Sequence, residues 1–223
     1  MLINFRNFLI PVLLLTFVLS SCTTEDGMED DMEVVGDQDD DSGDDETDNE
    51  DERIDISPLV AKFYHEESLV ITVEDEYIII ESSNEPDHKS MYYDENHALF
   101  EAYDEPNNPD FKKNPNRINA QDFVFKIPRF PSEATNKEAT PMGPMGVAVN
   151  SVAFFNQQAA PGDDILEELN TFDQYEGHPA QGGDYHYHIE PIWLTDNKLE
   201  KDSFLGLLLD GFPVYGPQEN GQT

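Results

Sequence analysis

Apolar residues occur along most of this chain in short runs separated by turn residues. Beyond Ser57-Pro58 these runs are rich in β-branched and aromatic side chains, which favour β-strands. Strands are expected over residues 68–73, 77–80, 122–127, 146–155, 185–189 and 204–209. The run 146–155 is interrupted by Asn150-Ser151, so it is either one broken strand or a hairpin. The pattern predicts a mainly β fold.

Only one segment indicates a helix. Residues 164–170 (DILEELN) have helical spacing, and Asp163 or Asp164 can cap the N-terminus. Residues 84–115 and 131–144 are rich in Pro, Asn, Asp and Gly and should be mainly loop. We therefore predict short strands with long irregular loops and one short helix.

The N-terminus has the pattern of an export signal. The apolar run 8–18 is too short to span a bilayer comfortably, and it ends in Leu19-Ser20-Ser21-Cys22. That ending matches a lipobox, so residues 1–22 are predicted to be a lipoprotein signal peptide with Cys22 as the lipidated residue. The alternative is an ordinary secretory signal with a chance cysteine. The lipobox implies a membrane partner, through the lipid on Cys22, and a place in the bacterial cell envelope, at the outer membrane or the cell surface.

The next segment, 23–56, is strongly acidic. Between residues 25 and 55 there are 18 Asp and Glu and one basic residue. Such a segment buries too little apolar surface to fold, so a disordered acidic linker is predicted. The whole chain has a formal charge of −36, which argues against nucleic acid as a partner. The acidity suits a cation or a metal ion, or serves solubility alone.

The histidines are the most concentrated group of candidate functional residues. In an extended Tyr185-His186-Tyr187-His188, the two imidazoles lie on one face of the strand and can converge on one ion. His178 lies across a Gly-rich turn and can fold back as a third ligand. Neutral imidazoles suit transition metals, copper or zinc above all. Asp184 and Glu190 are candidate hydrogen-bond partners of these imidazoles or oxygen ligands.

The histidine segment also carries a family resemblance. The tetrapeptide Tyr185-His186-Tyr187-His188, followed by residues 209–217 (LDGFPVYGP), resembles the YHYH domain family, and weaker matches extend the resemblance over about residues 78–217. It supports a YHYH-type domain over 57–223 and implies no activity. Members of that family often continue beyond the last of these segments, so the domain is expected to be incomplete at its C-terminus.

The resemblance adds a fourth candidate ligand, His88, in a segment (SNEPDH) that resembles the start of the family pattern. Asp210, at the end of the aliphatic run 205–209, is a further carboxylate that either supports the site or caps the turn at Gly211.

Three functions remain open. The first is a lipid-anchored, extracytoplasmic domain that binds a transition metal. The second is a metal-dependent enzyme with the same ligands, although the chain lacks Gly-x-Ser-x-Gly, His-Glu-x-x-His and phosphate-loop motifs. The third is a surface interaction module in which the histidines are ordinary strand residues.

Overall fold

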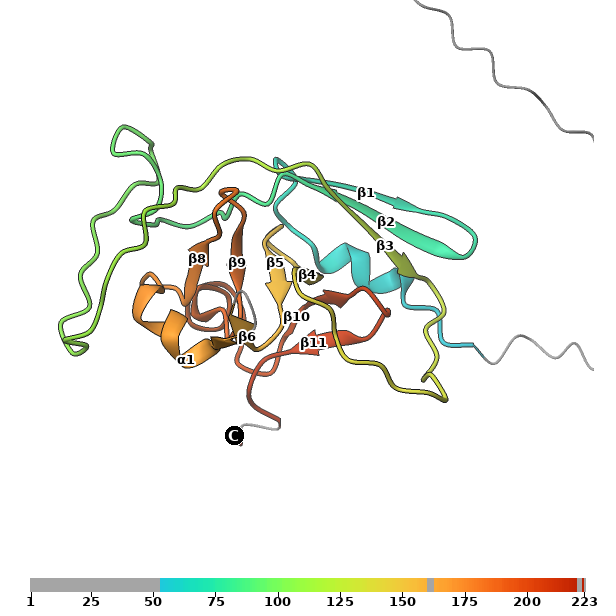
Figure 1. The fold of residues 1–223 in the computed structure, drawn as a ribbon. Coiled ribbons are helices and arrows are strands. Elements are labelled where there is room, and N and C mark those ends of the chain that lie inside the picture. The colour runs from blue at the N-terminus through green and yellow to red at the C-terminus, as the bar shows by residue number, and fades with distance from the viewer. Residues whose placement is uncertain (1–52, 160–162, 220–221, 223) are drawn as a thin grey trace, which may run out of the picture. The chain divides into compact units, whose positions relative to one another are not determined.

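The computed structural model describes residues 53–159, 163–219 and 222 (Figure 1). The predicted signal peptide, Cys22 and most of the predicted acidic linker lie outside these residues. Within them the strands form one sheet of three strands, one of six and one of two, with a single short α-helix. The predicted fold class, mainly β with one short helix, is therefore confirmed. No helix in the described part of the chain is long and apolar enough to cross a membrane.

The three-stranded sheet is antiparallel and confirms three predicted strands. Its strands, in spatial order, are β1 (Leu69–Val73), β2 (Tyr77–Ser82) and β3 (Phe123–Pro128). Side chains alternate between the two faces, as the period of a strand requires. Ile78 and Ile80 on β2 and Phe125 and Ile127 on β3 are buried, whereas Val124 is 63% exposed. One face of this sheet therefore covers the core.

The six-stranded sheet carries the histidines. Its spatial order is β11 (Pro213–Tyr215), β10 (Phe204–Leu208), β4 (Pro144–Ala148), β5 (Ala153–Phe155), β9 (Tyr185–Tyr187) and β8 (Gly177–Pro179). Only β5 and β9 pair in parallel; the other neighbours are antiparallel. The hairpin reading of 146–155 is correct, because β4 and β5 are separate strands joined at Asn150-Ser151. Ser151 has a φ of +79°, which suits a tight turn.

The smaller elements include the predicted helix. It is α1 (Ile165–Glu168), followed by a 3₁₀ turn (Leu169–Thr171), and Asp164 caps it by accepting a hydrogen bond from the Leu166 amide at 3.0 Å. The elements that the sequence pattern did not predict are a 3₁₀ helix (Ser57–Lys62), a π-helix (Leu194–Lys198), β8, β11 and the pair β6 (Gln158–Ala159) and β7 (Asp163–Asp164).

The folded region begins slightly before the boundary predicted at Ser57. Ile56 is 6% exposed, and its amide donates a hydrogen bond to the Arg129 carbonyl at 3.0 Å. Arg129 also pairs with Asp55 at 2.6 Å. The last residues assigned to the linker therefore pack on the domain, because Ile56 supplies an apolar side chain within an acidic stretch.

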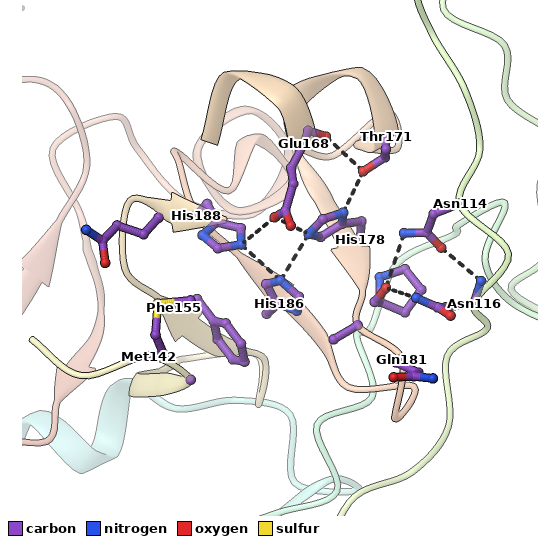
Figure 2. A pocket seen from close by; sticks show the side chains of 14 residues that line it. Asn114, Asn116, Met142, Phe155, Glu168, Thr171, His178, Gln181, His186 and His188 are labelled. Atoms are coloured by element: carbon purple, nitrogen blue, oxygen red, sulfur yellow. Dashed lines mark hydrogen bonds and ion pairs between the residues drawn. The ribbon is translucent and has the colours of Figure 1, made fainter. Parts of the chain in front are cut away.

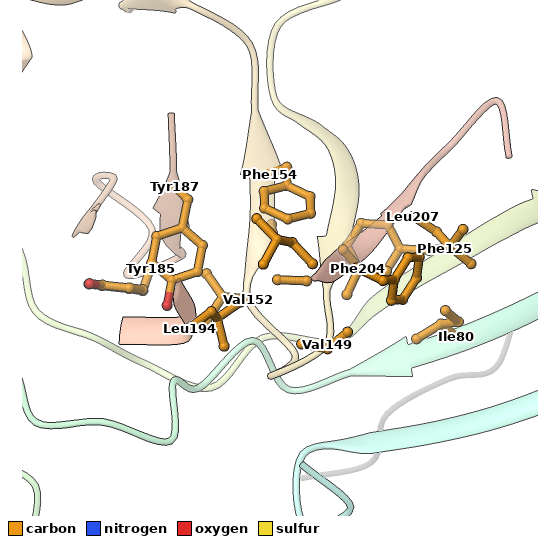
Figure 3. Close-up of a cluster of buried hydrophobic side chains, with 14 of the residues drawn as sticks. Ile80, Phe125, Val149, Val152, Phe154, Tyr185, Tyr187, Leu194, Phe204 and Leu207 are labelled. Atoms are coloured by element: carbon orange, nitrogen blue, oxygen red, sulfur yellow. The ribbon is translucent and has the colours of Figure 1, made fainter. Parts of the chain in front are cut away.

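The core fixes which way β9 faces. Tyr185 and Tyr187 are fully buried and belong to the same cluster of apolar side chains as Phe154 and Leu194 (Figure 3). Because side chains alternate along a strand, the burial of both tyrosines turns His186 toward the opposite face. The core thus orients the histidine face of this strand.

Candidate metal centre

A hairpin brings two of the histidines together. Strands β8 and β9 pair antiparallel with His178 directly opposite His186, so the two side chains lie on the same face of the sheet. Gly177 makes this pairing possible, since a Cβ there would lie 2.4 Å from the ring of Tyr185. Gly183 in the connecting turn has a φ of +88°, a conformation that side chains disfavour. The predicted return of His178 across the turn is confirmed.

Four side chains converge at one point, and we call them the His/Glu cluster: Glu168, His178, His186 and His188. Each offers one ligand atom, and these four atoms lie within 4.8 Å of one another. The Nε2 atom of His186 is 3.0 Å from Nε2 of His178 and 3.0 Å from Nε2 of His188. Figure 2 shows Glu168 reaching the histidines from the α1 side. Its Oε2 atom lies 3.4 Å from Nε2 of His178 and 3.5 Å from Nε2 of His188.

The opposite nitrogen of each ring is already bound to an oxygen. Nδ1 of His186 lies 2.9 Å from the Asp184 carbonyl, and Nδ1 of His188 contacts the Asn156 carbonyl. Carbonyls only accept hydrogen bonds, so both Nδ1 atoms carry the proton. A neutral imidazole with a protonated Nδ1 has its lone pair on Nε2. Both rings therefore direct an unprotonated nitrogen into the cluster.

The tautomer of His178 follows from Thr171. The Thr171 hydroxyl donates to the Glu168 carbonyl at 2.8 Å, so its oxygen can accept from Nδ1 of His178, 2.6 Å away. His178 then also has its lone pair on Nε2. Three lone pairs and a carboxylate oxygen consequently point at the same small volume.

Burial keeps two of these rings neutral. The pKa of His186 is held well below its usual value, first by burial and then by the neighbouring His178. Burial also lowers the pKa of His188. Phe155 stacks on His186 with ring centroids 4.0 Å apart and adds to the apolar surroundings. The neutral imidazole is the form that binds metal ions, so this group can hold one.

Glu168 is the cluster member that the sequence reasoning missed. It is the last residue of α1 and lies ten positions before His178, where no spacing rule relates it to the histidines. The helix itself was predicted, and a carboxylate at its end was the only signal in the sequence. Thr171 and Asn156, which fix two of the imidazoles, were missed for the same reason.

His88, the predicted fourth ligand, lies elsewhere. It is 1% exposed, and its Nε2 is 3.0 Å from the hydroxyl of Tyr187, a side chain on the opposite face of β9 from the cluster. Its Nδ1 donates to the Lys89 carbonyl at 2.9 Å, and rings of Tyr175 and Trp193 surround it. The place expected for His88 is held by Glu168, and His88 belongs to the core.

Among the described contacts, none of the three predicted carboxylate partners reaches a cluster imidazole through its side chain. Asp184 contacts His186 through its backbone carbonyl instead of its carboxylate. Glu190 accepts hydrogen bonds from Thr195 at 2.5 Å and Lys201 at 2.8 Å. Asp210 is exposed and accepts from the Phe212 amide at 3.2 Å, which agrees with the turn-cap alternative.

A cavity of about 390 Å³ adjoins the cluster. All four cluster residues line it, together with Phe155, Met142 and several carboxamide side chains (Figure 2). Glu168 is the most exposed cluster member: its side chain is 26% exposed, against 6% for His178 and 2% for His188, and His186 is 3% exposed as a whole residue. The cluster is therefore accessible from the side of Glu168.

Comparison with known proteins supports the family resemblance. The family model described as "YHYH protein" matches residues 124–222, which include the whole cluster. No curated protein and no solved structure matches the chain. The match confirms the predicted resemblance over these residues and brings no ligand or activity with it.

Proposed function

Since residues 124–222 belong to the YHYH family, we propose that this domain binds one transition-metal ion through the His/Glu cluster. One observation carries the proposal: each Nδ1 in the cluster is satisfied by an oxygen, which leaves three Nε2 lone pairs facing one another. Lone pairs at 3.0 Å repel unless a proton or a cation lies between them. A cation in the middle converts that repulsion into four favourable contacts.

The charge balance supports a divalent ion. Three neutral imidazoles and one carboxylate reduce the charge of a divalent ion to +1, so the buried site carries little net charge. Burial favours the neutral imidazoles for the same reason, because it penalises the protonated forms. His186 and His188 therefore need not lose protons at neutral pH before they bind metal.

The geometry supports zinc or copper(II). Bonds of about 2.0–2.1 Å to nitrogen and oxygen place neighbouring ligand atoms about 3.3 Å apart in a tetrahedron and about 2.9 Å apart in a square plane. The four measured separations run from 3.0 to 3.5 Å and accommodate both. No cysteine belongs to the described cluster, so a thiolate-bound ion is not expected there.

The proposal places this site in the bacterial envelope. A lipid on Cys22 would anchor the chain, and the acidic residues up to about position 52 would separate the metal site from the membrane. A domain in that position would capture or hold metal ions outside the cytoplasm. The absence of a second cysteine in the sequence leaves the fold independent of disulfides there.

Metal content is the direct test. The full chain is dialysed against zinc or copper(II), then against metal-free buffer, and analysed by mass spectrometry for metal. One ion per chain is expected, with loss of that ion in His186→Ala and retention in His97→Ala, which changes an exposed histidine. Weak binding by the acidic N-terminal residues is common to all three proteins and cancels in the comparison. Equal metal content in His186→Ala and wild type would contradict the proposal.

A further inference from the structure

We infer that the cavity beside the His/Glu cluster admits a small uncharged polar molecule, which coordinates the bound ion on its Glu168 side. This inference rests on the proposed function, because the ion supplies one of the contacts. It adds a ligand class and an open coordination position, neither of which metal binding alone requires.

Access to the ion is the first observation. The side chains of His178 and His188 are almost fully buried, while the Glu168 side chain is 26% exposed and lies in the cavity wall. An incoming donor atom therefore reaches the ion beside Glu168. With four protein ligands already on the ion, the incoming atom takes a fifth position, an expansion that zinc sites allow. The volume of about 390 Å³ is within the range of pockets that hold small ligands.

The chemistry of the walls is the second observation. Among the described residues that line the cavity, Glu168 is the only Asp, Glu, Lys or Arg. Four carboxamides also line it, namely Asn114, Asn116, Gln158 and Gln181. Carboxamides donate and accept hydrogen bonds without charge, so they match hydroxyl and amide groups. An anionic ligand would meet the Glu168 carboxylate and find no cationic side chain on the described walls.

One wall is held in place before any ligand arrives. The side-chain amides of Asn114 and Asn116 both donate to the Pro179 carbonyl, at 3.2 and 3.1 Å. Pro179 follows His178 on β8, so these bonds connect the wall to the cluster. A preformed wall reduces the entropy lost when a ligand binds.

The test uses the full chain loaded with cobalt(II), whose visible absorption changes with its ligands. Isonicotinamide and isonicotinate serve as probes: they have the same size and ring nitrogen, and differ in charge. Isonicotinamide should change the spectrum saturably without releasing cobalt. Isonicotinate should bind at least about tenfold more weakly, because the described walls offer its carboxylate no cationic side chain.

Two variants test whether the probe binds in the cavity. Gln181→Trp, at an exposed residue of the wall, should weaken isonicotinamide binding at least about tenfold while cobalt affinity stays unchanged, because the larger side chain fills the space. Gln157→Trp changes an exposed residue outside the described wall and should leave both unchanged.

Each outcome has a distinct meaning. Stoichiometric cobalt with a spectrum that isonicotinamide does not alter would overturn the inference and leave the proposed metal site intact. Release of cobalt by the probe, equal binding of isonicotinate, or normal binding in Gln181→Trp would also overturn it. Failure of cobalt itself to bind would refute the proposed function, and the inference with it.

Discussion

Thr171 offers a sharp test of how the cluster is prepared for a metal ion. Its hydroxyl oxygen accepts the Nδ1 proton of His178 at 2.6 Å and donates to the Glu168 carbonyl at 2.8 Å. Thr171→Val keeps the shape of the side chain and removes both bonds. The imidazole of His178 then has no acceptor for the proton that metal binding requires on Nδ1.

The expected loss of metal affinity in Thr171→Val follows from where that proton lies. In the metal-free variant, the proton can move to Nε2 of His178 and be donated to Nε2 of His186, 3.0 Å away, so folding is only moderately weakened. Metal binding reverses this shift and leaves a buried N–H without a partner, at a cost of about 1–3 kcal/mol. Loss of a hydrogen bond that orients a metal-binding histidine typically weakens affinity about 10–100-fold, which agrees with that cost.

Competition against a chelator of known affinity measures the effect, with zinc as the metal. Thr195→Val is the matched control, because Thr195 is a buried threonine whose hydroxyl donates to Glu190, outside the cluster. We expect zinc affinity to fall in Thr171→Val and to remain at the wild-type value in Thr195→Val. An affinity within twofold of wild type in Thr171→Val would refute the tautomer argument.

Three further predictions concern the stability of the folded domain. Gly177→Ala should lower the free energy of unfolding by about 2–3 kcal/mol in urea titrations, since the new Cβ overlaps the Tyr185 ring; a value equal to that of Gly182→Ala would contradict the packing argument. Burial lowers the pKa of His88 to about 4, so below its ordinary pKa of about 6.5 only the unfolded chain takes up this proton. The free energy of unfolding therefore falls as pH drops from about 6.5 to about 4. In urea titrations at each pH, His88→Gln should lose roughly 3 kcal/mol less than wild type over that interval. If the free energies of the two proteins fall in parallel with pH, His88 is not neutral in the fold. Zinc at about a thousand times its Kd should raise the Tm of wild type by about 10 °C in circular dichroism melts. The Tm of His186→Ala should not change. An equal rise in both proteins would show that the ion binds elsewhere.

Much of the fold could be predicted because its strands are locally encoded. The alternation around Ile78 and Ile80 and the apolar runs of β4 and β10 follow the period of a half-buried or buried strand. By contrast, β8 is only Gly-His-Pro, which resembles a turn, and it is a strand because it pairs with β9. Tertiary pairing decides such short segments, and no local pattern reports it.

The site was predictable where one strand or one turn determines the geometry. His186 and His188 are two residues apart, and His178 returns across a short turn, so their approach follows from chain geometry. Glu168 arrives from a separate helix, and its position depends on how α1 packs. His88 failed as a ligand because its polar loop folds into a buried aromatic cluster, a contact that depends on residues 99 positions away.

X-ray absorption on the zinc- or copper-loaded full chain tests the central claim most directly. The account predicts three imidazole nitrogens and one oxygen at about 2.0–2.1 Å from the metal, with the multiple scattering that imidazole rings produce. A shell of oxygens alone, without an imidazole signal, would contradict it, because the ion would then be bound by carboxylates and water instead of the three histidines.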